Sequence, residues 1–489
     1  MRNLRAIADR ALVHRWAGWL LLGLLAALYT LAYLRHPLFP GQAPAALRQG
    51  WWSWGDQFEY WKSASALAHG NLSPASHRYP LGYPALGSLF VRAMPVHPFF
   101  FPDLALVLGA ACLWWRLALR WLSRVEALAL AVAFIVAHAH LLADTVVIPW
   151  NTIATQGTLL GGIWVTLTQA GRRAVLWLAV LAGLTYLVRP IDAVAFAPLL
   201  VWATLRLPTW RERSFAGISG IGFVLLAMAL AAAANQAIFG DWRSPYEANS
   251  WRSIGFFSYP AMQKFYWLLL DGRTFFGETE PGLVLRYPWL LLAVPGAFHF
   301  VRREGSAAIA ALLTLGLSWT LYFNYNDFLP SDIYRFTLVH YLVWGFFPLA
   351  LLAAAACLRG WRDRATQAGF ALAALLVIVA LGLRLEEQPL PASAASPWTL
   401  PAARPLVVRF PGVPAEAFTQ LRLDGRPLPE YLEFVTPYVP MDLQLLVGTR
   451  TAGSALSVVP GSTITAPPEF ARLVWRWRLR PSRLAQLFR

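Results

Sequence analysis

The sequence has few charged residues and almost no cysteine. Only 13% of its 489 residues are Asp, Glu, Lys or Arg, and 57% are hydrophobic, whereas soluble domains carry about one quarter charged residues. This composition excludes an ordinary water-soluble domain. The two cysteines, Cys112 and Cys357, both lie in apolar segments. Neither a disulfide framework nor a cysteine-based zinc cluster is therefore expected.

Acidic residues are scarce beside basic ones, so the formal net charge is +16. A nucleic-acid-binding protein would gather Lys and Arg on a soluble face, but here they separate apolar runs. We therefore expect no nucleic-acid partner and interpret the chain as an integral membrane protein. The first apolar run, Trp16–Leu34, is long enough to span, and no small-residue cleavage site follows it. We interpret it as a retained first helix rather than a removed signal peptide.

Long apolar runs predict a polytopic, mainly α-helical membrane protein with about eleven transmembrane helices. The segments that begin at Ala127, Ala174 and Trp289 are the shortest. The eleven expected segments are Trp16–Leu34, Phe99–Trp121, Ala127–Leu142, Val146–Ala170, Ala174–Val188, Ile191–Leu207, Phe215–Phe239, Trp289–Val301, Ala307–Phe323, Phe336–Cys357 and Ala365–Leu385.

The positions of the arginines predict the orientation of these helices, because short cytoplasmic loops hold an excess of Lys and Arg. Alternate connections carry arginine pairs or triplets, so the N-terminus is expected on the cytoplasmic side. The loops 35–98, 240–288 and 324–335, and everything after Arg384, are then expected outside. The arginines concerned are Arg120, Arg124, Arg172, Arg173, Arg206, Arg211, Arg213, Arg302, Arg303, Arg359, Arg362 and Arg364.

The C-terminal part of the chain has a different pattern. Pro and Ser are frequent over 386–405, which we interpret as a linker. Short alternating runs such as Leu406–Phe410 and Leu421–Leu423 follow, broken by Gly and Pro. They predict a small β-rich domain over 406–489 outside the cytoplasm, after a transmembrane domain over 1–385.

The first outer loop holds the clearest candidates for chemistry. Asp56 and Glu59 open a stretch with helical spacing, and their spacing matches a capping box. A carboxylate at a helix N-terminus also stays ionised, which suits a general base or a metal ligand, and the two roles are compatible. Further along, Arg78 can bind a phosphate, and His77 can assist it or bind a metal. The alternative for both is contact with lipid head groups.

Several motifs in a fixed order resemble the GT-C superfamily of membrane glycosyltransferases, which includes protein O-mannosyltransferases and lipid A aminoarabinose transferases. The order also includes a large outer loop ending near Gly282 and a soluble domain after the last span. The motifs are Gly55-Asp56-Gln57-Phe58-Glu59-Tyr60, Tyr79-Pro80-Leu81-Gly82-Tyr83-Pro84 and Leu181-Ala182-Gly183-Leu184-Thr185-Tyr186-Leu187-Val188-Arg189-Pro190.

The resemblance implies a GT-C-like helical domain in the cell inner (cytoplasmic) membrane, in contact with membrane lipids. It implies a sugar donor linked to polyprenyl phosphate, an acceptor glycan, lipid or protein on the outer face, and inversion at the anomeric carbon. Carried onto this sequence, Asp56 would activate the acceptor or bind a metal, and Asp144 matches a second acid. Gln57 departs from the commoner Asp-Glu pair, which leaves a divalent metal, with Asp56 and Asp144 as its ligands, an open alternative.

The chemistry needs a base for the acceptor hydroxyl and cations for the leaving phosphate. Asp56 can be the base, and we expect Arg189 and Arg335, at the outer ends of helices, to be the foremost phosphate ligands. The alternative for both arginines is snorkelling to head groups, with Asp192 and Asp332 as ion-pair partners. His138 and His140 do not share a helical face, which disfavours a two-histidine metal site. The candidate phosphate-binding residues are Arg78, Arg189, Arg273, Arg335 and His340.

Two other functions compete with glycosyl transfer. A transporter or flippase for lipid-linked envelope glycans would show internal repeats, broken helices in matching halves and charges at mid-membrane, which this sequence does not show convincingly. A non-catalytic partner in envelope assembly, binding through the C-terminal domain, is compatible with the sequence.

Overall fold

The computed structural model describes residues 16–41, 49–53, 55–139, 142–247, 261–271, 282–323, 340–391, 396–401, 406–413, 415–427, 434–435, 443–447 and 453–477. The chain divides into two compact units. The first consists of Met1–Tyr246, Leu292–Ser318 and His340–Gly369, and the second of Glu247–Leu291, Trp319–Val339 and Phe370–Arg489.

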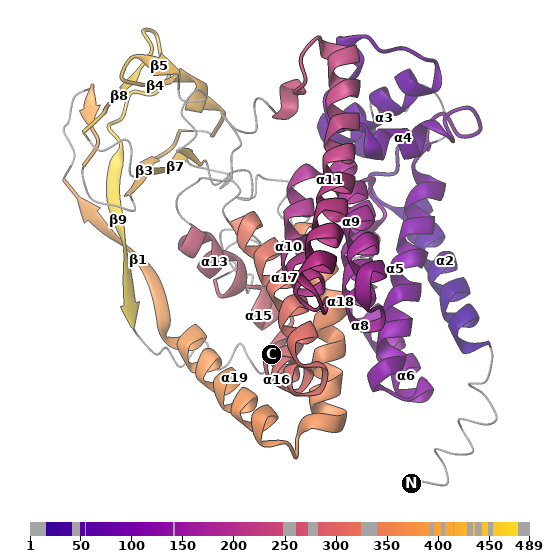
Figure 1. The fold of residues 1–489 in the computed structure, drawn as a ribbon. Helices are drawn as coiled ribbons and strands as arrows, with labels where there is room; N and C mark the ends of the chain where they lie inside the picture. Colours follow the sequence, from indigo (N-terminus) through magenta and orange to yellow (C-terminus); the bar gives the residue numbers. More distant parts are fainter. Residues whose placement is uncertain are drawn as a thin grey trace. The chain divides into compact units, whose positions relative to one another are not determined.

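The first unit is helical, and Figure 1 shows its long helices packed side by side. Its longer helices are α2 (Ala17–Arg35), α3 (Gly55–Ala68), α5 (Phe100–Trp121), α6 (Arg124–Ala137), α8 (Thr152–Thr168), α9 (Gly171–Val188), α10 (Ala197–Leu205), α11 (Trp210–Phe239), α16 (Ala293–Glu304), α17 (Ser306–Phe323), α18 (His340–Ala355) and α19 (Arg364–Gly382), of which α17 and α19 continue into the second unit. Its shorter elements are η2 (Gly50–Ser53), η3 (Pro74–Ser76), α4 (Gly82–Ser88), η4 (Leu142–Val146), η5 (Pro190–Phe196) and the π turn η10 (Ala356–Gly360), while η6 (Pro288–Leu292) belongs to the second unit up to Leu291.

Within the part of the chain that the structure describes, six helices are long and apolar enough to cross a membrane, which indicates a membrane protein. They are α2, α5, α9, α11, α17 and α18 with η10. Each of the eleven apolar segments expected from the sequence contains a helix. In the other five, α6, α8, α10, α16 and α19, the described apolar helix is shorter than the length needed to cross a membrane. For example, α6 has 14 residues and α8 has 17, and a straight span needs about 20.

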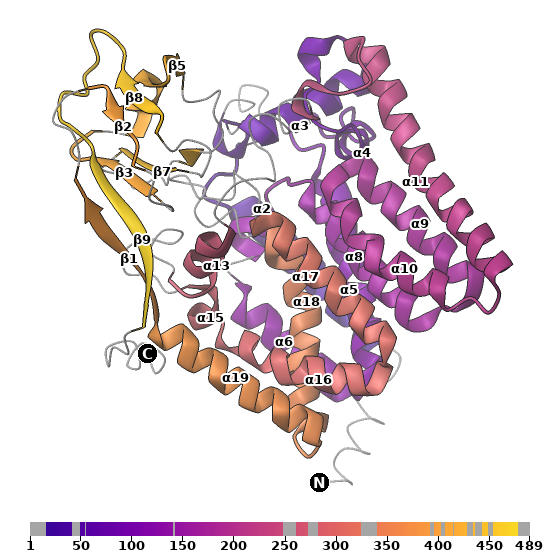
Figure 2. The same cartoon turned by 60° about the vertical axis from the view of Figure 1, so that its left-hand side comes forward.

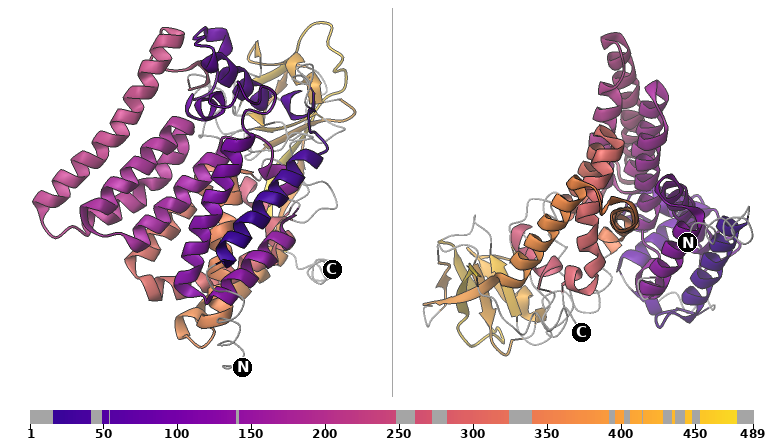
Figure 3. Two further views of the ribbon diagram at one scale, coloured as in Figure 1. Left: turned by 90° about the vertical axis from the view of Figure 1, so that its right-hand side faces the viewer. Right: turned by 90° about the horizontal axis from the view of Figure 1, so that it is seen from below.

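Close helix contacts in the first unit depend on small residues. Helices α5, α8, α9 and α11 pack each against the next (Figure 3, left, where α11 is the long pink helix). At Gly296 of α16, an added Cβ would lie 2.1 Å from the carbonyl oxygen of Leu352 in α18. Only a residue without Cβ allows this approach of the two backbones.

The arginine-rich connections meet at one end of the helices. Arg120 at the end of α5 pairs with Glu304 at the end of α16 (3.1 Å), and Arg172 at the start of α9 pairs with Glu212 at the start of α11 (3.1 Å). The π turn η10 joins the same end, because its Arg359 pairs with Glu126 of α6. Arg302 likewise pairs with Asp363. The alternate connections that carry arginines in the sequence therefore lie at the same end of the helices in the structure.

The second unit contains a β sandwich, visible in Figure 2. One sheet has the strand order β1-β9-β3-β7-β6 and the other β2-β8-β4-β5, with all pairs antiparallel. Alternate residues of β3, including Val408 and Phe410, share a core with Leu421 and Leu456 of the other sheet. The strands are β1 (Leu383–Leu390), β2 (Trp398–Thr399), β3 (Leu406–Phe410), β4 (Leu421–Leu423), β5 (Arg426–Pro427), β6 (Phe434–Val435), β7 (Leu443–Val447), β8 (Ala455–Val458) and β9 (Glu469–Trp477).

The β-rich region begins earlier than the expected boundary at residue 406. Strand β1 follows α19 without a gap and takes up the start of the expected linker 386–405. Its eight residues pair with β9 from Leu383 opposite Trp477 to Leu390 opposite Phe470. Pro389 fits this strand because β1 lies at the edge of the sheet, where prolines in sheets are found.

A helix from the large loop 240–288 also belongs to this unit. Helix α13 (Ala261–Leu269) places Tyr266 edge-on against Trp475 of β9, with ring centres 5.2 Å apart. Trp267 packs with Leu473 and Val407 on the same sheet. The short α15 (Leu283–Arg286) follows, and an added Cβ on Gly282 would lie 2.7 Å from the backbone of Leu269. Loop and sandwich therefore form one unit.

Candidate functional site

Asp56 lies in the first turn of α3, which begins at Gly55, and its side chain is half-buried. The hydroxyl of Tyr79 donates a hydrogen bond to its Oδ1. Within the described residues no backbone N–H of α3 donates to this carboxylate, so the capping geometry expected from the spacing is not formed there. Burial raises the pKa of Asp56, while the Tyr79 hydrogen bond and the charges of Arg78 and Arg189 act in the opposite direction.

Tyr79 packs against two other tyrosines. Its ring centre lies 5.0 Å from that of Tyr60 and 4.7 Å from that of Tyr246. Tyr79 is 9% exposed, and burial, followed by the nearby Asp56 charge, raises its pKa far above the usual value. The hydroxyl therefore stays protonated and remains a hydrogen-bond donor to the carboxylate.

The other candidates in the first outer loop have different surroundings. Glu59 forms an ion pair with Lys62 at 2.8 Å on the same helix. His77 is buried, with Nδ1 2.8 Å from Ser63 Oγ and Nε2 2.9 Å from the carbonyl oxygen of Asn71. Both of its ring nitrogens are thus occupied in holding this loop together. Arg78 is exposed and lies over the Tyr79 ring, 5.8 Å from its centre.

Arg189 lies directly after α9, which ends at Val188 because Pro190 disfavours a helical residue before it. Its Nε is 3.1 Å from Asp192 Oδ2, and its Nη1 donates to Asn151 Oδ1 at 2.8 Å. The guanidinium also lies 4.9 Å from the centre of the Tyr341 ring. With a side-chain exposure of only 11%, it is a well-held cation rather than an arginine free to reach distant head groups.

The sequence interpretation missed the segment 149–152, which leads into α8. The carbonyl oxygen of Pro149 accepts from Gln57 Nε2 at 3.2 Å, and Asn151 accepts from Arg189. Trp150 stacks on His340 with ring centres 4.1 Å apart, and Thr152 Oγ1 is 2.9 Å from His340 Nδ1. Four consecutive residues thus contact three separate parts of the site. None of the four is charged, so composition gave no signal of this role.

His340 and Gln57 each leave one buried polar atom unused within the described part of the chain. His340 is 3% exposed and opens α18; its Nε2 has no hydrogen-bond partner there. Gln57 is fully buried, and its Oε1 likewise has no partner. Such atoms are costly to leave unsatisfied and are often completed by water or a ligand.

The structure thus brings together two of the sequence candidates from distant parts of the chain. Asp56 and Arg189 interact electrostatically, and Arg189 also acts on His340. Arg189 and its partners lie at the start of α8, the end of α9 and the start of α18. These helix ends are opposite the arginine-rich connections. Arg273 and Arg335 lie outside the described residues. Asp144 belongs to η4, but the description does not extend to its side chain.

A fully buried carboxylate at the start of α5 was not anticipated from the sequence. Asp103, in the first turn of α5, is fully buried and accepts from the Tyr83 hydroxyl with both oxygens, at 3.0 and 2.9 Å. Nearby, the Tyr33 hydroxyl is 2.8 Å from His97 Nδ1. The Tyr83 contact ties α4 to α5, and Tyr83 in turn packs edge-on against Tyr60 of α3. This cluster therefore supports the loop that carries Asp56.

The described side chains around Asp56 do not suit a divalent ion. No group of three or more His, Cys, Asp or Glu side chains converges within the part of the chain that the structure describes. The nearest charges include the cations Arg78 and Arg189, which repel a metal ion. We therefore route no chemical step through a metal.

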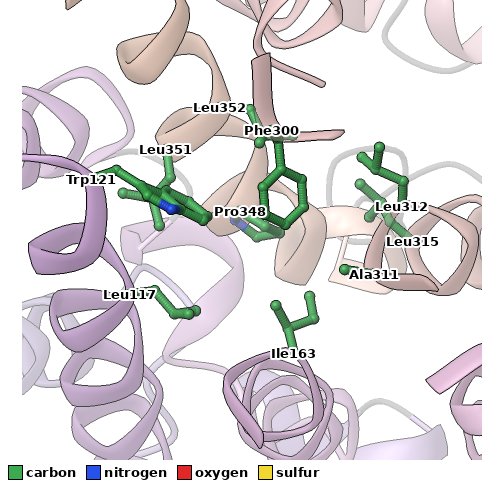
Figure 4. A pocket seen from close by; sticks show the side chains of 10 residues that line it. All are labelled: Leu117, Trp121, Ile163, Phe300, Ala311, Leu312, Leu315, Pro348, Leu351 and Leu352. Atoms are coloured by element: carbon green, nitrogen blue, oxygen red, sulfur yellow. The ribbon is translucent and has the colours of Figure 1, made fainter. Parts of the chain in front are cut away.

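A small cavity lies elsewhere in the helical unit. It has a volume of about 20 Å³, and Figure 4 shows the side chains of α5, α8, α16, α17 and α18 that surround it, among them Trp121, Phe300 and Pro348. Trp121 and Phe300 place it toward the arginine-rich end. Room for about one water between apolar side chains makes it a packing gap rather than a substrate site.

Comparison with known proteins yields no relative that would assign these features. No protein-family model, no curated protein and no solved structure matches this chain.

Proposed function

We propose that this chain is a membrane glycosyltransferase of the GT-C type. It would move a sugar from a polyprenyl-phosphate donor to an acceptor on the outer face of the cytoplasmic membrane. The proposal rests on Asp56, half-buried at the start of α3, and on Arg189, which Asp192 and Asn151 hold at the end of α9 and whose charge lowers the pKa of Asp56. A base for a hydroxyl and a cation for a phosphate then lie at the same end of an apolar helical bundle.

The proposed reaction is a single displacement that uses these two groups. The acceptor oxygen attacks the anomeric carbon and forms the new glycosidic bond while its proton passes to Asp56. The bond from the anomeric carbon to the phosphate oxygen breaks, and the electron pair leaves with the polyprenyl phosphate. Arg189 stabilises the negative charge that develops on that phosphate. Inversion at the anomeric carbon follows, because attack and departure occur on opposite faces.

His340 supports the same assignment. When Thr152 donates to its Nδ1, the proton of the neutral ring lies on Nε2, the buried nitrogen that lacks a partner among described residues. An N–H in this position can donate to a phosphate oxygen or a sugar hydroxyl. The orientation proposed for the chain, with the arginine-rich connections in the cytoplasm, puts this site on the outer side.

The substitution Asp56→Asn tests the proposal. Asn has nearly the same shape and still accepts a hydrogen bond from Tyr79, but it cannot take a proton. We expect a folded protein that binds donor lipid and transfers sugar about a hundred- to ten-thousand-fold more slowly. The measurement is release of polyprenyl phosphate from radiolabelled polyprenyl-phosphate sugars in proteoliposomes, in the presence of membrane extracts as acceptor source.

The nearby Glu59→Gln is the matched control, since Glu59 is a carboxylate on the same helix that forms an ion pair with Lys62. Transfer by Asp56→Asn at the wild-type rate would refute the catalytic assignment. Wild-type protein that moves labelled lipid across the bilayer without consuming it would instead identify a transporter.

A further inference from the structure

The hydroxyl of Tyr79 is the one hydrogen-bond donor that contacts the Asp56 carboxylate within the described residues. It reaches Oδ1, so Oδ2 is left for another partner. A carboxylate held at one oxygen loses much of its rotational freedom, and its second oxygen is presented in a defined direction. The contact joins α3 to a segment 23 residues further along the chain.

The ring of Tyr79 cannot easily move away from this contact. Its ring centre lies 5.0 Å from that of Tyr60 and 4.7 Å from that of Tyr246, and only 9% of the residue is exposed. The next residue after Tyr79 is Pro80, which restricts the backbone. The hydroxyl is therefore placed by packing rather than by the hydrogen bond alone.

We propose that Tyr79 is the positioning residue of Asp56: its hydroxyl holds Oδ1, which leaves Oδ2 to receive the acceptor proton. This inference rests on the proposed function and adds a residue through which Asp56 is prepared for it. The groups that also face Asp56 are Arg78 beside Tyr79, Glu59 on α3 and Arg189 after α9. Other titratable groups described in this region are Tyr60, Tyr246, His340, Tyr341 and Asp192, the ion-pair partner of Arg189.

The direction of the pH effect follows from the hydrogen bond. Donation to the ionised carboxylate lowers the pKa of Asp56 against the raising effect of burial. Removal of the hydroxyl therefore raises the pKa, and a higher pH is needed to ionise the base. In Tyr79→Phe the ring and its packing remain, so the loss is confined to the hydrogen bond.

The experiment compares Tyr79→Phe with Tyr60→Phe, which removes a hydroxyl from the same aromatic cluster without a hydrogen bond to Asp56. In Tyr79→Phe we expect transfer to fall about tenfold more on the acid side of the pH profile than on the alkaline side, as expected for one hydrogen bond to a charged group. In Tyr60→Phe the acid limb of the profile stays at the wild-type pH.

A second measurement does not depend on transfer. Infrared difference titration of the purified protein follows the carboxyl band that disappears in Asp56→Asn, and its midpoint should move to higher pH in Tyr79→Phe only. An unchanged midpoint in Tyr79→Phe overturns the positioning role. A shifted midpoint in Tyr79→Phe, together with a wild-type protein that transfers no sugar, would support the positioning role and contradict the proposed function.

Discussion

Arg189 has three partners within the described residues, unlike an arginine that extends to lipid head groups. Its planar guanidinium meets Asp192, Asn151 and the face of Tyr341 at once. A lysine carries the same charge but lacks the fork that makes parallel hydrogen bonds. Replacing Arg189 with lysine therefore changes the hydrogen-bonding geometry while the charge is kept.

We predict that Arg189→Lys weakens donor binding about tenfold or more, the equivalent of losing one hydrogen bond to a charged group. The measurement is equilibrium binding of a polyprenyl-phosphate sugar to detergent-solubilised protein. The exposed Arg78 supplies the control, because Arg78→Lys changes the same residue type without breaking a buried network. Equal binding by Arg189→Lys and wild type would show that this arginine has only a structural role.

At the residue scale the sequence indicated charged groups better than neutral ones. Asp56 was identifiable as an acid that opens a helical stretch in the first outer loop, and Arg189 as an arginine at the outer end of an expected helix. Asn151 and Thr152 were not, since their partners Arg189 and His340 are 38 and 188 positions away. Only the fold shows that these short polar side chains meet the charged ones.

Among the elements, α16 and α18 show how closely two helices can pack when one contributes a glycine. The Cβ that Gly296 lacks would overlap the backbone carbonyl of Leu352. This backbone atom cannot move without shifting the helix, unlike the flexible end of a side chain.

We predict that Gly296→Ala destabilises the protein by about 1–3 kcal/mol, the usual range for overpacking. Gly316→Ala in α17 is the matched control, because an added Cβ meets nothing within 4 Å there. It should be neutral or slightly stabilising, since Ala favours helix over Gly. Thermal unfolding in one detergent compares the two variants, and equal midpoints would contradict the close contact.

Helices were easier to predict than their ends. The length of an apolar run indicates whether a helix can cross the membrane, and each of the expected segments contains a helix. The transition from α19 to β1 was missed because the acids and Pro389 of β1 suit a linker as well as an edge strand. Pairing with β9, about ninety residues later in the chain, makes this segment a strand rather than a linker. No pattern in the local sequence indicates that pairing.

At the scale of the whole molecule, the orientation in the membrane is open to a direct test. In a background without Cys112 and Cys357, we predict that an impermeant thiol reagent modifies Ser73→Cys and Ala466→Cys in intact cells. Arg173→Cys should react only after the membrane is broken. All three positions are exposed, so accessibility within the protein does not limit the reaction. Protection of Ala466→Cys in intact cells would reverse the assignment of the C-terminal sandwich.

The ion pairs at the arginine-rich end have an electrical consequence. Arg120, Arg172, Arg302 and Arg359 each face an acid, so these pairs carry no net charge. Arginines such as Arg173 and Arg211 have no acidic partner among described residues, and they are the ones that respond to a voltage. Moving one elementary charge against 100 mV requires about 2.3 kcal/mol. In an energised cell with a negative interior, the unpaired arginines would therefore anchor the proposed orientation, and collapse of the membrane potential during insertion would weaken that anchor.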